Sequence, residues 1–463
     1  MNRVVLTIFF ALFFGAVFTN CDSKLVDLEV IKENEVITVP GDTDTVNHFK
    51  VVMEDGVAKF YKNGEPFFIR GTGGRFQNVR AASYGANAFR TWNTSSARRD
   101  LDTAKMCGTY LMMGIRLSHD IDDYRSETYK NEEREKISQL VDTYKNDPHL
   151  MIWCVGNEIN LYANIPEMWE FINELAGMIK EKDANHPVAT AISHSRPALD
   201  SIAKYAPNID VVGFQSYGAI HRMKEVFALS QYKGAYIVSE WGPNGHWENG
   251  FTLWGAPIES SSETKRVHYE TRYTDFILNN DRCIGSFVFL WGPMQKRTPT
   301  WYSMFVESSA THPRIQGLPL NGEATPGVES MEKLWTNAEP KERAPVVEGI
   351  TMNGRLVNQT ELFPGGAVVR AVVSAFDPRG YRMTFYWEIL KEATQFSTDG
   401  EIRPDRVGNV VTGASTDQDI RVPDTPGNYR LFVYVLNGRG MVGTSNIPFQ
   451  VGSATSSQVN QTK

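Results

Sequence analysis

Residues 150–158 read LMIWCVGNE, a nearly continuous apolar run that ends in an amide and a carboxylate. An apolar run of this length is typical of a parallel strand that is buried on both faces. In barrels of alternating strands and helices, the C-terminal ends of the strands form the functional face. The pair Asn157-Glu158 is therefore the first candidate for a functional site, whereas the other Asn-Glu pairs of the chain lie in polar or helical contexts.

Further apolar segments of strand length alternate with helix-like segments around this run. The expected strands span 67–71, 87–92, 110–116, 150–155, 188–192, 211–214, 236–239 and 285–291. Helix-like patterns lie between them, among them 131–145 and 261–279, and a last one covers 328–335. Alternation of this kind over about 270 residues predicts an α/β fold, a (β/α)8 TIM barrel. A doubly wound sheet is the alternative, but Arg70-Gly71-Thr72-Gly73-Gly74 lacks a third glycine at the offset that a dinucleotide-binding turn requires.

The pattern of apolar and polar residues changes near residue 338. Residues 339–345 are rich in proline and charge and predict a linker. The short alternating segments that follow predict a small all-β immunoglobulin-like sandwich over 346–452, with Trp387 as its core aromatic residue. We expect the barrel to cover 48–338, beginning with a short hairpin that turns at Lys62-Asn63-Gly64-Glu65, and the tail 453–463 to be disordered.

The first residues have the features of an export signal. Met1-Asn2-Arg3 supplies a positive charge, residues 4–18 are apolar, and Cys21 follows closely. This pattern resembles a bacterial lipoprotein signal over 1–21, in which the cysteine becomes the lipidated first residue; an ordinary cleaved signal peptide is the alternative. The lipoprotein interpretation predicts a polar tether over 22–47, a membrane anchor at Cys21 and a location in the bacterial cell envelope.

Length, charge and cysteine usage narrow the function classes. A chain of 463 residues is long for one domain, in agreement with a barrel and a sandwich. The net charge of -7 argues against a nucleic-acid partner, which would require a broad basic surface. Cys107, Cys154 and Cys283 are widely spaced in apolar contexts, so we expect buried thiols, no metal site and no disulfide framework. We expect no cofactor and no obligate protein partner.

A second expected strand also ends in a glutamate. Residues 235–240 read AYIVSE and repeat the pattern that ends at Glu158, about three βα units further along the chain. Glu158 and Glu240 should therefore face each other across the barrel mouth, from the fourth and seventh strands. Two carboxylates in a polar cleft can serve as proton donor and nucleophile in glycoside hydrolysis. For either glutamate alone, a structural pairing with a buried arginine is the alternative.

Other strand ends supply side chains for the same cleft. We expect Arg90 and Tyr217 to hydrogen-bond Glu240 and keep it ionised, and Asn157 to hold a substrate hydroxyl. Trp291, at the end of the last expected strand, is predicted to form the apolar floor under the sugar. Further candidates for substrate contact, each of which could equally be a packing or loop residue, are Trp92, Asn93, His119 and Trp247.

Together these motifs resemble clan A glycoside hydrolases, in which Asn-Glu ends the fourth strand and a glutamate ends the seventh. The likeness covers most of residues 67–336. Within the clan, 87–91 (NAFRT) and 210–217 (DVVGFQSY) are similar to the family 2 catalytic barrel. A barrel followed by an immunoglobulin-like domain is also similar to glycoside hydrolase family 158, whose known activity is endo-β-1,3-glucanase. The resemblance implies Glu158 as acid/base, Glu240 as nucleophile, and retention of configuration.

The resulting expectation is a retaining β-glycosidase that acts on a β-linked poly- or oligosaccharide, its carbohydrate partner, by double displacement. A transglycosylase could use the same two glutamates and differ only in its acceptor. A glycan-binding lipoprotein without catalysis is the alternative from another class. We expect the sandwich to be a spacer, because no exposed row of aromatic residues is evident in its sequence.

Overall fold

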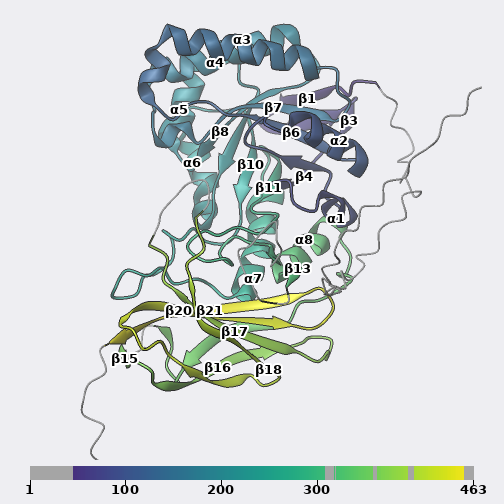
Figure 1. The fold of residues 1–463 in the computed structure, drawn as a ribbon. Coiled ribbons are helices and arrows are strands. Elements are labelled where there is room, and N and C mark those ends of the chain that lie inside the picture. Colours follow the sequence, from purple (N-terminus) through teal and green to yellow (C-terminus); the bar gives the residue numbers. More distant parts are fainter. Residues whose placement is uncertain (1–44, 308–317, 319, 358–361, 395–400, 453–463) are drawn as a thin grey trace, which may run out of the picture. The chain divides into compact units, whose positions relative to one another are not determined.

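The computed structural model describes residues 45–307, 318, 320–357, 362–394 and 401–452, which belong to one compact unit, Thr43–Lys463 (Figure 1). The expected signal at 1–21 with Cys21, nearly all of the tether, and the tail from 453 lie outside the described residues. Within the described part, no helix has both the length and the apolar character that crossing a membrane requires.

Among the described residues, eight parallel strands close into a barrel in the order β10-β11-β4-β5-β6-β7-β8-β9. These strands are β4 (Ile69–Gly73), β5 (Ala88–Arg90), β6 (Tyr110–Ile115), β7 (Leu150–Asn157), β8 (Val188–Ser193), β9 (Val211–Gln215), β10 (Ala235–Trp241) and β11 (Cys283–Val288). Helices alternate with them: α1 (Asn78–Ser83), α2 (Ala97–Cys107), α3 (Glu127–Tyr144), α4 (Pro166–Lys182), α5 (Arg196–Tyr205), α6 (Met223–Leu229), α7 (Ser262–Arg272) and α8 (Pro326–Thr336). The predicted (β/α)8 barrel is confirmed.

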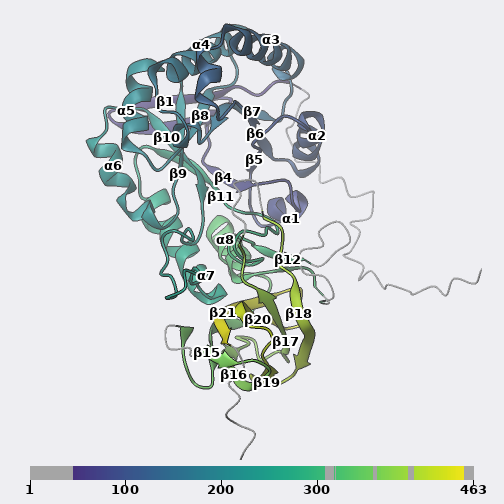
Figure 2. The ribbon, with the colours of Figure 1, turned by 60° about the vertical axis from the view of Figure 1, so that its left-hand side comes forward.

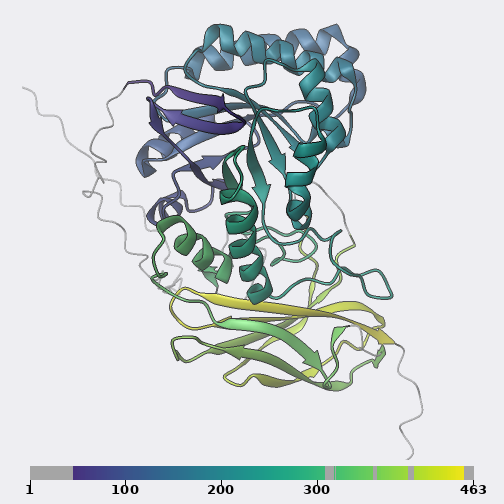
Figure 3. The ribbon, with the colours of Figure 1, turned by 180° about the vertical axis from the view of Figure 1, so that it is seen from behind.

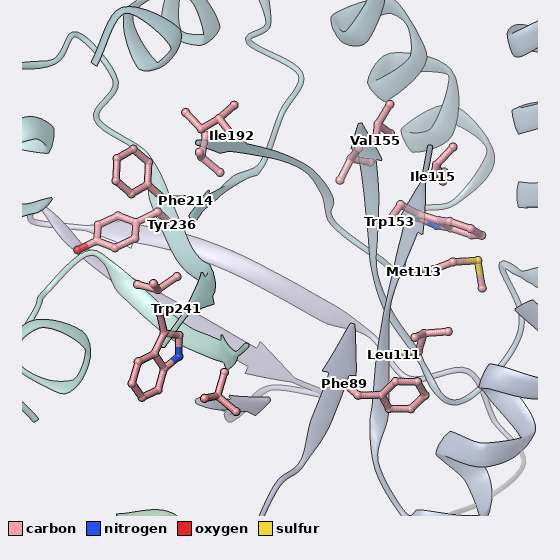
Figure 4. Close-up of a cluster of buried hydrophobic side chains, with 14 of the residues drawn as sticks. Phe89, Leu111, Met113, Ile115, Trp153, Val155, Ile192, Phe214, Tyr236 and Trp241 are labelled. Atoms are coloured by element: carbon pink, nitrogen blue, oxygen red, sulfur yellow. The ribbon is translucent and has the colours of Figure 1, made fainter. Parts of the chain in front are cut away.

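Strand β7 illustrates how the sequence produces this arrangement. Trp153 and Val155 belong to the hydrophobic layer between the strands and the surrounding helices (Figure 4), whereas Ile152 and Cys154 belong to the core inside the barrel. Both faces of the strand are covered, which explains why its apolar run does not alternate. At its C-terminal end the backbone of Glu158 has φ 52°, a left-handed conformation that turns the chain out of the strand.

Two helix boundaries differ from the prediction for local reasons. Helix α3 begins four residues before the expected start at 131, because the Ser126 side chain accepts a hydrogen bond from the Tyr129 backbone N–H and caps the first turn. The expected helix over 261–279 consists of α7 followed by a π-helical segment, η4 (Tyr273–Leu278). Helix α7 packs beside α8, as the view from behind shows (Figure 3).

The segment before the barrel is a three-stranded meander and not the single hairpin that the sequence predicted. Its strands are β1 (Phe49–Glu54), β2 (Val57–Lys62) and β3 (Glu65–Pro66). The expected turn at Asn63-Gly64 joins β2 to β3, and Asp55-Gly56, another turn signal of the same type, joins β1 to β2. Phe49 and Phe60 pack into the interior core beside Ile69, the first residue of β4, so the meander covers the N-terminal ends of the strands.

Beyond the linker, two sheets form a β-sandwich (Figure 2). One sheet has the order β14-β16-β19 and the other β15-β21-β20-β17-β18. The strands are β14 (Val346–Met352), β15 (Leu362–Pro364), β16 (Val368–Phe376), β17 (Thr384–Lys391), β18 (Arg406–Gly413), β19 (Asp417–Arg421), β20 (Gly427–Leu436) and β21 (Val442–Gly452). Trp387 is buried between the sheets, as predicted. The all-β architecture is confirmed, and the immunoglobulin-like assignment stays a prediction. A short ribbon of β12 (Phe305–Glu307) and β13 (Asn321–Ala324) precedes α8.

Candidate active site

The C-terminal ends of the barrel strands surround a cavity that contains both predicted glutamates. It consists of two adjoining parts of about 440 Å³ and about 850 Å³, and Glu158, Glu240, Phe289 and Met294 line both parts. We call the two parts together the glutamate cavity. Its size is that of a pocket for a small molecule or for a few units of a polymer.

Glu240 is buried, and among the described residues three side chains donate hydrogen bonds to it. Its Oε1 accepts from the Trp92 indole Nε1 at 2.6 Å and from the Arg90 guanidinium at 3.4 Å. Its Oε2 accepts from the Tyr217 hydroxyl at 3.1 Å. Burial is the largest effect and raises the pKa of Glu240 above its usual value, although the charge of Arg90 and the hydrogen bonds from Trp92 and Tyr217 act in the opposite direction. These donors stabilise the ionised carboxylate and fix its direction.

Arg90 joins the ends of three strands. Its guanidinium is fully buried and also donates to the Ser239 carbonyl oxygen at 2.8 Å and to Asn157 Oδ1 at 2.9 Å. The Gln215 amide donates to the same Asn157 oxygen at 2.6 Å. Both lone pairs of that oxygen are thereby engaged, which orients the Asn157 amide group beside the cavity.

Glu158 has different surroundings. Within the described part of the chain, no side chain or backbone group donates a hydrogen bond to its carboxylate. Burial and, next in importance, the negative charge of Glu240 raise the pKa of Glu158 to about 8, against weaker opposing effects of Arg90 and Lys296. The two carboxyls therefore differ at neutral pH: Glu158 holds a proton, and Glu240 has the donors that a carboxylate needs.

The other predicted substrate contacts lie at or near this cavity. Trp92 lines it and also donates a hydrogen bond to Glu240, a contact that was not predicted from the sequence. Asn93 and His119 line the smaller part, and the His119 ring stacks on Tyr162 at 4.2 Å between centroids. Trp247 lines the larger part and meets the Tyr217 ring edge-on at 5.9 Å.

The expectation for Trp291 is corrected by the structure. Its side chain is fully buried against Phe305 and Trp335, with ring centroids 5.2 Å and 5.8 Å away, and does not line the cavity. The reason is that β11 ends at Val288, three residues before the predicted end. Beyond this point the side chains no longer alternate between the two faces of a strand, so the direction predicted for Trp291 does not hold. Phe289 lines the cavity instead, and its ring packs edge-on against Trp92 at 5.8 Å.

Several cavity residues were not predicted from the sequence. They are Arg116, Tyr162, Phe289, Met294 and Lys296. Lys296 lies in the long loop after β11, and loops after strands carry such residues in barrels of this type, but the type of side chain alone gave no reason to choose it. Gln215, the last residue of β9, supports Asn157 through its side-chain amide. No cluster of side chains suited to a metal ion occurs among the described residues.

Comparison with known proteins gives one match to a family. The model described as "Glycosyl hydrolases family 2, TIM barrel domain" matches residues 84–288, a stretch that includes both glutamates and the strands from β5 to β11. No curated protein matches the chain.

Similar solved structures include three β-glucuronidases. The enzyme of Bacteroides uniformis is 14% identical with a TM-score of 0.47, and the match covers 88% of this chain and 48% of that chain. The enzyme of Dictyoglomus thermophilum is 16% identical with a TM-score of 0.45, over 63% and 54% of the two chains. That of Ruminococcus gnavus is 13% identical with a TM-score of 0.45, over 63% and 53%. The chain spans about half the length of these structures.

Proposed function

We propose that the chain is a glycoside hydrolase that cleaves β-glycosidic bonds with retention of configuration. Glu240 is the nucleophile in this proposal, and Glu158 is the general acid and later the general base. The observation that carries the proposal is the contrast between two carboxyls in one cavity: Glu240 accepts three hydrogen bonds, whereas the pKa of Glu158 is raised to about 8. The family 2 barrel match over residues 84–288 supports the hydrolase class.

In the first step, Glu240 Oε attacks the anomeric carbon while Glu158 gives its proton to the departing glycosidic oxygen. The bond between the sugar and this oxygen breaks, and an ester between the sugar and Glu240 forms. Arg90, Trp92 and Tyr217 hold the attacking carboxylate in one orientation, which lowers the entropic part of the barrier.

The second step follows from the coupling of the two charges. Esterification removes the negative charge of Glu240, which is one of the two causes of the raised pKa of Glu158. The pKa of Glu158 therefore falls once the ester has formed, which favours the carboxylate that Glu158 becomes when it gives its proton to the leaving group. As a carboxylate it takes a proton from water, which attacks the anomeric carbon and releases Glu240.

Aryl β-glycosides with good and poor leaving groups test these roles. Glu240→Gln should abolish turnover of every substrate. Glu158→Gln should impair aryl glycosides with poor leaving groups most, because these need protonation. Glu225→Gln, which alters an exposed carboxyl on α6, is the matched control and should behave as the parent protein. Full activity of Glu240→Gln would end the assignment.

For the substrate, we propose a β-linked glucan, with β-1,3-glucan as the first polysaccharide to assay, on the strength of the resemblance to glycoside hydrolase family 158. A panel of β-glucans, mannans and galactans that begins with laminarin is the direct screen. The appearance of lengthened oligosaccharides among the products would indicate transglycosylation in place of hydrolysis.

We also propose that the protein is exported and anchored by lipid at Cys21, because that cysteine directly follows an apolar signal-like segment. The test is incorporation of a clickable fatty acid in a bacterial host, with Cys21→Ala as the comparison. Equal labelling of the two proteins would contradict the anchor.

A further inference from the structure

A second cavity of about 990 Å³ lies beside the glutamate cavity, where the loop after β10 meets the sandwich. We call it the junction cavity. His246, Trp247 and Arg297 line both cavities, so the two adjoin each other. The junction cavity is therefore the neighbouring space for the rest of a chain-like ligand that has one bond between Glu158 and Glu240.

The barrel side of the junction cavity carries aromatic rings. Trp247, Phe251 and Trp254 all lie in the loop after β10, and 58% of the surface of Trp247 and 52% of that of Phe251 are exposed. Large aromatic rings that are exposed beside a cavity are typical of ligand-binding surfaces. Burial of such rings stabilises a fold, so rings that the fold leaves exposed are available to contact a ligand. The flat C–H face of a pyranose ring matches such a surface.

The sandwich side of the same cavity is more polar. Asp405 and Asn428 line it and bring carboxylate and amide groups that can bond to hydroxyls, and Ile402 adds an exposed apolar side chain. Aromatic rings on one wall and hydrogen-bonding groups on the other suit a ligand rich in hydroxyl groups.

The loop that carries the rings is held in place. The Glu248 carboxylate accepts hydrogen bonds from the backbone N–H groups of Gly218, Ala219 and Gly245 at 2.6, 2.7 and 2.7 Å. These bonds tie the loop to the segment after β9. A wall fixed before binding loses little conformational entropy when a ligand binds.

Buried polar contacts also tie the sandwich to the same loops. Arg430 on β20 donates to the Pro257 carbonyl oxygen at 2.8 Å, and Asn446 on β21 donates to Glu259 at 2.6 Å. The Arg297 backbone N–H donates to Glu401 at 2.6 Å. Hydrogen bonds thus join the two walls of the junction cavity. Breaking them would leave buried polar groups without partners, which costs free energy.

We propose that the junction cavity binds the continuation of the glycan whose bond is cleaved at Glu158 and Glu240, so that the sandwich is part of the substrate-binding surface. This inference rests on the proposed function and names its substrate class: a β-linked oligo- or polysaccharide several sugar units long. It replaces the spacer role expected for the sandwich. Catalytic efficiency should then rise with chain length until the junction cavity is filled.

The test compares Phe251→Ala with Leu253→Ala. Phe251 lines the junction cavity, whereas Leu253, fully exposed in the same loop, does not. The measured quantity is the ratio of kcat/KM for a long oligosaccharide to kcat/KM for a short aryl glycoside. Phe251→Ala should lower this ratio by about tenfold, the loss expected for one buried ring. Leu253→Ala should leave the ratio unchanged. An unchanged ratio in Phe251→Ala and in Phe251→Ala/Trp254→Ala would overturn the proposal.

Binding to Glu240→Gln separates this inference from the proposed function. Calorimetry of this variant with oligosaccharides of increasing length should give affinities that increase with length, and adding Phe251→Ala should remove much of the increase. If the parent protein binds longer oligosaccharides more tightly but turns over no substrate, the hydrolase assignment is wrong and the junction cavity remains a glycan-binding site. If the parent protein turns over aryl glycosides but its affinity does not depend on oligosaccharide length, the junction cavity is not a binding site and the hydrolase assignment stands.

Discussion

Raising the pH through the pKa of Glu158 should stop the first chemical step, because only the protonated carboxyl can protonate the departing oxygen. With a pKa of about 8, Glu158 is about 90% protonated at pH 7. A carboxyl with the ordinary pKa of 4.5 would be about 0.3% protonated at that pH. The environment of Glu158 therefore supplies roughly 300 times more of the competent acid form at neutral pH.

The assay is the pH dependence of kcat/KM for a glycoside with a poor leaving group, between about pH 5 and about pH 10. We expect kcat/KM to fall about tenfold per pH unit above pH 8 or so. Glu158→Gln should lose this fall, because it has no proton to lose. Lys296→Met should move the fall to higher pH, since Lys296 lowers the pKa of Glu158.

Two outcomes would exclude Glu158 as the acid with the raised pKa. One is a fall of kcat/KM that begins near pH 5, as an unperturbed carboxyl would give. The other is a fall near pH 8 that persists in Glu158→Gln, which would assign the titration to another group.

Three further predictions concern the surroundings of the site. Trp92→Phe removes the 2.6 Å hydrogen bond to Glu240 and should lower kcat/KM by about 10- to 100-fold. Tyr217→Phe removes the 3.1 Å hydrogen bond and should cause a smaller loss. If both variants were as active as the parent protein, these two hydrogen bonds would not contribute to catalysis. Glu259→Gln leaves buried Lys265 without its counter-charge and should lower the free energy of unfolding by roughly 3 kcal/mol in a denaturant titration, whereas an unchanged midpoint would contradict the buried pair. Trp291→Phe should lower the free energy of unfolding by roughly 1–2 kcal/mol and leave KM unchanged, because the side chain is buried away from the cavity. A raised KM would indicate that Trp291 contacts the sugar after all.

The barrel was predictable because the alternation of apolar strands and amphipathic helices is repeated along the chain. Each strand is covered on both faces, so the apolar runs that end at Glu158 and Glu240 are long and distinct from the amphipathic helices. The same continuous apolar character makes the exact end of a strand hard to predict. In an apolar run with no polar residue to mark its end, the sequence does not tell which of Phe289 and Trp291 faces the cavity.

The partners of the two glutamates were predictable in part. Arg90 ends β5 and Tyr217 lies two residues after β9, and the structure places both beside Glu240 as expected. Trp92 as a donor to Glu240 and Gln215 as a support of Asn157 depend on side-chain directions across the barrel mouth, which no local pattern encodes. The junction cavity depends on how the loop after β10 meets strands more than 150 residues later, as in the contact of Arg430 with Pro257.

The proposed mechanism depends on covalent attachment of Glu240 to the sugar. The most direct test is incubation with a 2-deoxy-2-fluoro β-glycoside of whichever sugar is hydrolysed, followed by proteolysis and mass spectrometry. We expect one sugar esterified to the peptide that contains Glu240, and no label in Glu240→Gln. Rapid turnover of the normal substrate without any labelled peptide, or a label on Glu158, would exclude Glu240 as the nucleophile.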